Sequence, residues 1–310
     1  MSSDTRFLGK SFCVTKVIGR YDSPRYDRWM GSQVGILQSV RVRAMVIPRE
    51  HGAWGMLLVP MVTGAIVGSV SPTRNYVAFT VFAFAALALF WLRTPVEAWL
   101  GTTPVKAQGG SERQTVAIFT VVLSAAALLG LGWLFLAGYF RGLLVIGAGA
   151  AAAFAAQALV RALGRARRML AQIVGSVGLT ATAAAAYYVT TGRLDRTALG
   201  LWLANGLFAG NQVHYVRLCI RGSRAARAQE KLQLGMSFLA GQVLLLLGIL
   251  IGIRLGDVPA LVLFAFAPAL LRGVLWFHGG RKPLQVHQLG FSELRQSLLF
   301  GALLCLAVLS

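Results

Sequence analysis

"TVAIFTVVLSAAALLGLGWLFLAGY", residues 115–139, contains no charged side chain. A helix of about 20 predominantly apolar residues is long enough to cross the roughly 30 Å hydrocarbon core of a bilayer. Every backbone group of a helix is satisfied within the segment, so a helix is the form in which a single apolar segment crosses a membrane. The stretch therefore predicts a transmembrane helix.

Eight further apolar segments have comparable lengths. The whole chain is 56% hydrophobic and only 13% charged, against about 25% charged in ordinary soluble domains. The predicted fold is all-α, a polytopic membrane bundle of about nine transmembrane helices formed by residues 45–310. The other eight segments are 53–70, 76–92, 142–160, 169–190, 197–216, 234–253, 258–275 and 292–309.

The N-terminal residues 1–44 differ from the rest because they are polar, basic and free of any apolar run. Such a composition has little apolar surface to bury, which predicts a flexible tail. An alternative is that translation begins at Met45.

The net charge is +20, and the basic residues are distributed unequally between the two sides of the predicted bundle. With nine spans, 25 Lys and Arg residues fall on one side of the membrane and 5 on the other. Because cytoplasmic loops of membrane proteins carry an excess of Lys and Arg, the N-terminus is predicted to be cytoplasmic and the C-terminus external, in a bacterial inner membrane. The basic excess therefore does not indicate nucleic-acid binding, and membrane lipids are the expected partners.

Small residues recur four positions apart in three predicted spans: Gly64 and Gly68, Gly206 and Gly210, Gly248 and Gly252. This spacing lets helix backbones approach closely. It indicates a compact bundle and says little about function.

A charged stretch stands immediately before the first apolar segment. It contains Arg49, Glu50, His51 and Trp54. Glu50 and His51 can supply an acid and a base, and a carboxylate next to an imidazole favours its protonated form. Alternatively, they cap the first helix, since a carboxylate is stabilised at a helix N-terminus.

The end of the sixth segment carries a polar stripe, consisting of Asn211, His214, Arg217 and Arg221. At 100° per residue these positions lie within about 120° of one helix face. Such a stripe should face protein or water, although the two arginines can also snorkel to the interface. Since guanidinium groups bind phosphate oxygens bidentately, we expect a cationic mouth for an anionic lipid headgroup, to which Arg93 and Lys282 can also contribute.

Three stretches carry a resemblance to a known family: "PREHGAWGMLLVP" (48–60), "VHYVRLCIR" (213–221) and "KPLQVHQLGFSELRQSLLF" (282–300). Together they resemble the YwiC-like family of bacterial integral membrane proteins, whose function is not established. The resemblance is expected to cover residues 46–310. It implies that the characteristic positions here are Pro48, His51, Gly52, Trp54, Pro60, Arg217 and Glu293.

Nine helices with polar residues on the cytoplasmic side also look like the UbiA superfamily of intramembrane prenyltransferases. Those enzymes bind a prenyl diphosphate through magnesium held by Asp-rich motifs of the type NxxxDxxxD and DxxxD. The corresponding loops here read "RTPVEAWLG" (93–101) and "RLCIRGSRAARAQEK" (217–231), and no two carboxylates in the chain are four residues apart. A metal-free site for an anionic or isoprenoid lipid is therefore favoured over a divergent prenyltransferase.

Other chemistries have weaker support. The sequence contains no CxxC, HxxxH or HExxH, so no metal site and no cofactor are expected. A small-solute transporter is a further alternative because Gln157, Gln172, Asn205, Asn211 and Gln242 lie within or near spans. We predict no ionisable residue near a helix centre, which argues against proton coupling there. Enzymatic activity and oligomeric state stay open.

Overall fold

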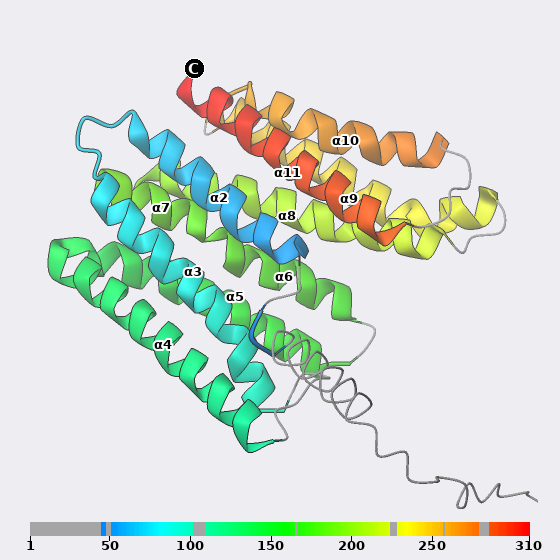
Figure 1. Cartoon of the computed structure of the whole chain (residues 1–310). Coiled ribbons are helices and arrows are strands. Elements are labelled where there is room, and N and C mark those ends of the chain that lie inside the picture. Colours follow the sequence, from blue (N-terminus) through cyan, green and yellow to red (C-terminus); the bar gives the residue numbers. More distant parts are fainter. Residues whose placement is uncertain are drawn as a thin grey trace, which may run out of the picture.

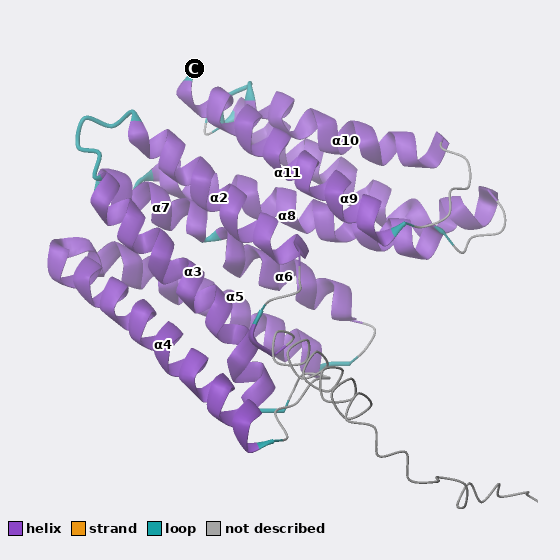
Figure 2. Cartoon of the chain, viewed as in Figure 1, coloured by secondary structure: helices purple, strands orange, loops and turns teal. Residues whose placement is uncertain are grey.

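The computed structural model describes residues 45–47, 51–101, 109–164, 167–223, 228–256, 258–278 and 285–310. All regular secondary structure in these ranges is helical (Figure 2). The predicted all-α fold is therefore confirmed. The predicted tail, residues 1–44, lies outside the described ranges.

Each of the nine predicted segments falls on a helix (Figure 1). Segment 115–139 corresponds to most of α4 together with η1, and segment 169–190 corresponds to α6 and α7 together. The helices are α2 (His51–Ser69), α3 (Tyr76–Trp99), α4 (Gly110–Leu134), η1 (Phe135–Tyr139), α5 (Phe140–Ala162), α6 (Arg168–Thr180), α7 (Thr182–Thr191), α8 (Arg196–Gly222), α9 (Ala228–Arg254), α10 (Val262–His278) and α11 (Val286–Leu309).

By length and hydropathy, six stretches of the described chain can cross a membrane. One of them, Gly110–Ala162, is 53 residues long and would measure roughly 80 Å if straight, more than twice the hydrocarbon thickness. It breaks at Gly138, whose φ of 94° is left-handed, and the chain reverses there between α4 and α5 (Figure 1). This stretch therefore supplies two antiparallel spans. The apolar helix α10 is shorter, at 17 residues.

The outer helices expose large apolar side chains. Leu136 is 92% exposed, Leu129 on α4 is 75% exposed, and Leu244 on α9 is 69% exposed. In water such surfaces would be a liability, whereas lipid tails are as apolar as the side chains. The exposed surface thus supports a polytopic membrane bundle.

The interior is built on close contacts of small residues. Gly64 and Gly68 of α2 pack against Ala183 and Thr190 of α7, and Gly206 and Gly210 of α8 face α6. The role predicted for these two pairs is confirmed. A Cβ on Gly248 would have no described atom within 4 Å, and one on Gly252 would meet only Val258. The third pair therefore does not join two helices at both positions.

One end of the bundle collects basic side chains, and we call it the basic end. Helices α5, α8 and α10 end there and α6, α9 and α11 begin there (Figure 1). Its described basic residues include Arg161, Arg167, Arg168, Arg217, Arg221, Lys231 and Arg295. The opposite end carries Arg74, Arg141, Arg193, Arg196 and Arg254. Which end faces the cytoplasm stays a prediction.

Candidate functional site

The structure describes only part of the charged stretch at the start of α2. Arg49 and Glu50 lie outside the described residues, as does Lys282, and His51 is described only as the first residue of α2. The choice between an acid–base role and a capping role for Glu50 and His51 therefore stays open.

The position of His51 along the bundle follows from the register of α2 and α11, which run parallel. A Cβ on Gly55 would contact the Ser297 hydroxyl oxygen at 3.9 Å, and Gly301 faces Val59 and Thr63. The Cys305 thiol donates to the Thr63 carbonyl oxygen at 3.9 Å, a pair that is 242 residues apart. The same offset places the start of α2, at His51, level with Glu293 of α11.

Trp54 has a packing role. Its ring makes edge-to-face contacts with Phe90 and Trp91 of α3, at centroid distances of 4.8 and 6.4 Å. The Trp91 indole N–H donates to the Val46 carbonyl oxygen at 2.7 Å, and Met45 is buried with Ala98 and Val116. The aromatic residue of the motif thus fastens the entry to α2 onto α3.

Arg93 also has a local partner. Helix α3 continues to Trp99, so Arg93 and Glu97 lie on a helix and not in the loop that the sequence predicted. Their side chains form an i,i+4 ion pair at 2.8 Å and are 47% and 37% exposed. Exposed helical pairs of this kind contribute only about 0.3–0.5 kcal/mol, so this pairing does not prevent Arg93 from meeting a ligand.

The predicted stripe on α8 lies at the basic end. His214 is partly buried between the Ser237 hydroxyl at 3.5 Å and the Phe238 ring. Arg217 and Arg221 are electrostatic neighbours of His214, and Arg168 of α6 is a neighbour of Arg217. No carboxylate among the described side chains forms an ion pair with these three arginines. Because like charges repel, the cluster would be stabilised by an anion.

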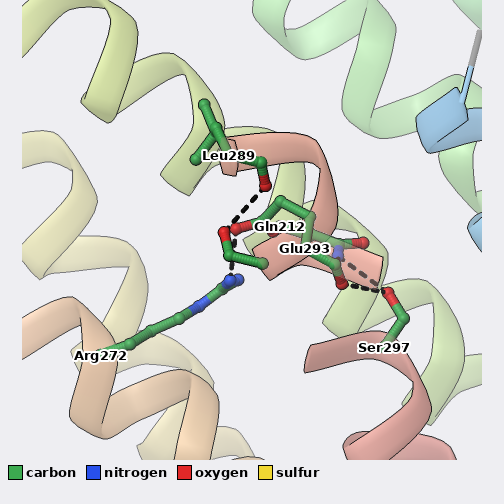
Figure 3. A network of polar contacts seen from close by, with 6 residues as sticks. Gln212, Arg272, Leu289, Glu293 and Ser297 are labelled. Atoms are coloured by element: carbon green, nitrogen blue, oxygen red, sulfur yellow. Dashed lines mark hydrogen bonds and ion pairs between the residues drawn. The ribbon is translucent and has the colours of Figure 1, made fainter. Parts of the chain in front are cut away.

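A second polar group lies deeper, among α8, α10 and α11 (Figure 3). The Arg272 Nη1 group donates to Glu293 Oε1 at 2.6 Å, and both side chains are about nine-tenths buried. The Gln212 amide donates to the Glu293 carbonyl oxygen and to the Ser297 hydroxyl, each at 2.8 Å. The Arg272 guanidinium lies over the Tyr215 ring, 4.2 Å from its centroid. We call Gln212, Tyr215, Arg272, Glu293 and Ser297 the buried polar centre.

This centre overturns one prediction. Arg272 lies near the middle of α10, where the sequence predicts no ionisable residue. The predicted segment 258–275 places Arg272 near its end, because a charged residue normally marks the end of an apolar run, whereas α10 continues to His278. A usable signal exists: an arginine inside an apolar stretch requires a partner, and Glu293 is an acid within another span.

The candidates thus fall into two separate groups. Glu293 is brought together with Arg272, Gln212 and Ser297. The described contacts of His214 are instead with α9, through Ser237, Phe238 and Gly241. Asn211 directly precedes Gln212 on α8, and its buried Oδ1 has no hydrogen-bond partner among the described residues.

A small cavity adjoins the buried polar centre. It is lined by α2, α6, α8 and α11, and its polar lining consists of Thr180, Asn205, Gln212 and Ser297. Its volume of about 10 Å³ is close to the room that one water molecule needs. Within the described ranges, no group of three or more His, Cys, Asp and Glu residues is arranged to hold a metal ion.

The fold and these two polar groups define a class, that of polytopic integral membrane proteins with polar residues near one end of a helical bundle. In a comparison with known protein families, the family described as YwiC-like protein matches residues 47–187. The predicted resemblance is confirmed over this range, which covers α2 to the middle of α7. The resemblance was expected over 46–310, and the match covers only the first part of this range, with α8 to α11 beyond it. No curated protein and no solved structure matches the chain.

Proposed function

We propose that this protein binds the phosphate-bearing headgroup of an anionic or isoprenoid lipid at its basic end, on the cytoplasmic side of the bacterial inner membrane. The observation that carries the proposal is the cluster of Arg168, Arg217 and Arg221 beside His214, described above. An anion held there relieves repulsion among the arginines.

The surroundings of the cluster suit a lipid. Arg217 is partly buried near the end of α8, while Arg221 and Arg168 are exposed. Juxtamembrane Lys and Arg each gain about 1 kcal/mol near an anionic membrane surface. A planar guanidinium also holds phosphate oxygens bidentately, which an ammonium does not. The proposal requires no metal, which is consistent with loops that lack paired carboxylates.

The experiment uses the purified protein in detergent and measures the shift of its melting temperature on addition of lipid. Phosphatidylglycerol, farnesyl diphosphate, inorganic pyrophosphate and phosphatidylcholine are compared. We expect stabilisation by the first two and none by phosphatidylcholine, because only ligands that bind the folded state raise its stability. Stabilisation by pyrophosphate alone would indicate a free phosphate ligand and would reject the lipid.

The variants are Arg217→Gln, Arg217→Lys and, as a matched control, Arg254→Gln at the opposite end. The two Arg217 variants should lose most of the lipid-dependent shift while the melting temperature without lipid changes little. Arg254→Gln should respond like the parent protein. Equal responses in all three variants would reject the proposed site.

Two other functions raised by the sequence have unequal support. A divergent prenyltransferase gains no specific observation from the described residues. A transporter gains one, because Arg272 and Glu293 are ionisable residues inside spans, where such residues commonly mark pathways.

A further inference from the structure

The buried polar centre contains donors and acceptors that the protein itself does not use. Of the three guanidinium nitrogens of Arg272, only Nη1 has a partner, while buried Nε and Nη2 have none among the described residues. Glu293 Oε2 is likewise buried without a partner, as is Gln242 Oε1. Leaving such groups unpaired costs about 1–3 kcal/mol each, and more for charged ones.

The unused nitrogens of Arg272 form one edge of the guanidinium. Nε and Nη2 point their hydrogens in the same direction, which is the fork that accepts a carboxylate through two parallel hydrogen bonds. The Tyr215 ring fixes the plane of this fork from one face. Gln242 lies close by on α9, with its side-chain amide carbon 3.6 Å from the position that a Cβ on Gly273 would take.

The buried polar centre lies close to the basic end. Arg272 lies before the end of α10, Tyr215 before the end of α8, and Glu293 after the start of α11. Each distance is about two helical turns, roughly 10 Å. The adjoining cavity, which Gln212 and Ser297 line, has a volume of about 10 Å³, close to the room for one water, so a carboxylate at the free edge of Arg272 requires a rearrangement of nearby side chains.

We propose that the buried polar centre binds a small monocarboxylate on the free edge of Arg272 and takes up one proton as it does so. The ligand's carboxylate would bind Nε and Nη2 of Arg272, just as the Glu293 carboxylate binds Nη1. This function is separate from lipid binding at the basic end and does not depend on it.

The proton follows from charge balance. Arg272 and Glu293 are together neutral, so a bound carboxylate would add an uncompensated negative charge at membrane depth. Two carboxylates sharing one site cannot readily both stay ionised, and an unpaired buried charge is very costly. The proton therefore goes from solvent to Glu293 Oε2, the oxygen that has no partner, and one carboxylate and one proton enter together.

Few other titratable groups face Glu293. Arg272 comes from α10, and Tyr215 and Cys219 come from α8. Helix α2 contributes no titratable residue from Gly52 to Ser69. Glu293 is therefore the group on which proton uptake should depend.

The test measures binding of acetate and formate to the purified protein by calorimetry at several pH values, together with proton uptake in weak buffer. Chloride serves as the anion control. In the parent protein we expect about tenfold tighter acetate binding per unit decrease in pH and one proton taken up per acetate, as linkage requires for one coupled proton.

Two variants separate the roles of the pair. Glu293→Gln removes the competing charge, so acetate should still bind, more tightly at neutral pH than in the parent, with neither pH dependence nor proton uptake. Arg272→Lys lacks the fork and should weaken binding at least tenfold. Arg141→Gln, at the opposite end, should behave like the parent.

Several outcomes would overturn the proposal. One is the absence of acetate and formate binding at every pH. Others are binding that persists unchanged in Arg272→Lys, and proton uptake that persists in Glu293→Gln. If Arg272→Lys fails to fold, proton uptake by the parent on acetate binding and its loss in Glu293→Gln decide, because a purely structural ion pair predicts no acetate-linked proton uptake in the parent.

Discussion

Gly64 of α2 lies so close to Ala183 of α7 that a Cβ atom on Gly64 would overlap the Ala183 carbonyl oxygen. Both residues belong to the interior of the bundle, where Ala183 is fully buried. The obstacle is backbone, which cannot rotate away as a side chain would. The close approach of these two helices therefore depends on the absence of a side chain at position 64.

Gly64→Ala should destabilise the protein by about 1–3 kcal/mol, the usual cost of overpacking a core. Gly147→Ala is the control, since no described atom lies within 4 Å of the position its Cβ would take. Unfolding by a denaturing detergent, followed by circular dichroism, measures the difference. Equal midpoints for the two variants would contradict the close contact.

The Arg272–Glu293 pair should show strong energetic coupling. Arg272→Met leaves a buried carboxylate without its partner and should cost about 3–5 kcal/mol. The double variant Arg272→Met with Glu293→Met removes both charges and should be closer to the parent protein in stability. The same unfolding assay completes a double-mutant cycle. Additive losses would show that the two side chains do not interact.

Trp91→Phe should loosen the segment before α2. The substitution keeps an aromatic ring near Trp54 but removes the donor to the Val46 carbonyl oxygen. A net cost of about 0.5–1.5 kcal/mol is expected for one such hydrogen bond. Hydrogen exchange should report faster exchange in residues 45–47 of the variant, with α8 to α11 unchanged as an internal control. Faster exchange throughout the bundle would mean that the effect is global.

The topology prediction concerns the two ends of the bundle. Helices α2 and α11 run parallel, so the C-terminus lies at the end opposite to the start of α2 (Figure 1). A reporter fused at residue 165, between α5 and α6, should be cytoplasmic, and one fused after Ser310 should be external. If both reporters were on the same side, the number of spans between residue 165 and Ser310 could not be odd.

Much of the fold was predictable because apolar length is a local property. Segments such as 76–92 and 234–253 fall within α3 and α9, since one run of apolar residues suffices to identify each. The helix ends were less accurate. Helix α3 continues through Pro95 to Trp99, and Arg93 and Glu97 pair along its surface, whereas hydropathy alone treats both charges as the end of a span.

The buried polar centre was harder to predict because it joins residues from three helices. The periodicity of α8 drew attention to Asn211 and His214, whereas the residue that contacts Glu293 is Gln212, on a different face. Hydropathy also placed Arg272 near the end of the predicted segment 258–275. A contact between residues 81 positions apart, such as that of Gln212 with Glu293, leaves no periodic trace in a single sequence.

The reversal at Gly138 bears on how the protein is made. From Thr115 to Val160 the only charged residue is Arg141, and α4 and α5 are separated only by the five residues of η1. No hydrophilic loop therefore separates the two helices as the chain is synthesised. We therefore expect α4 and α5 to enter the bilayer together, as one hairpin.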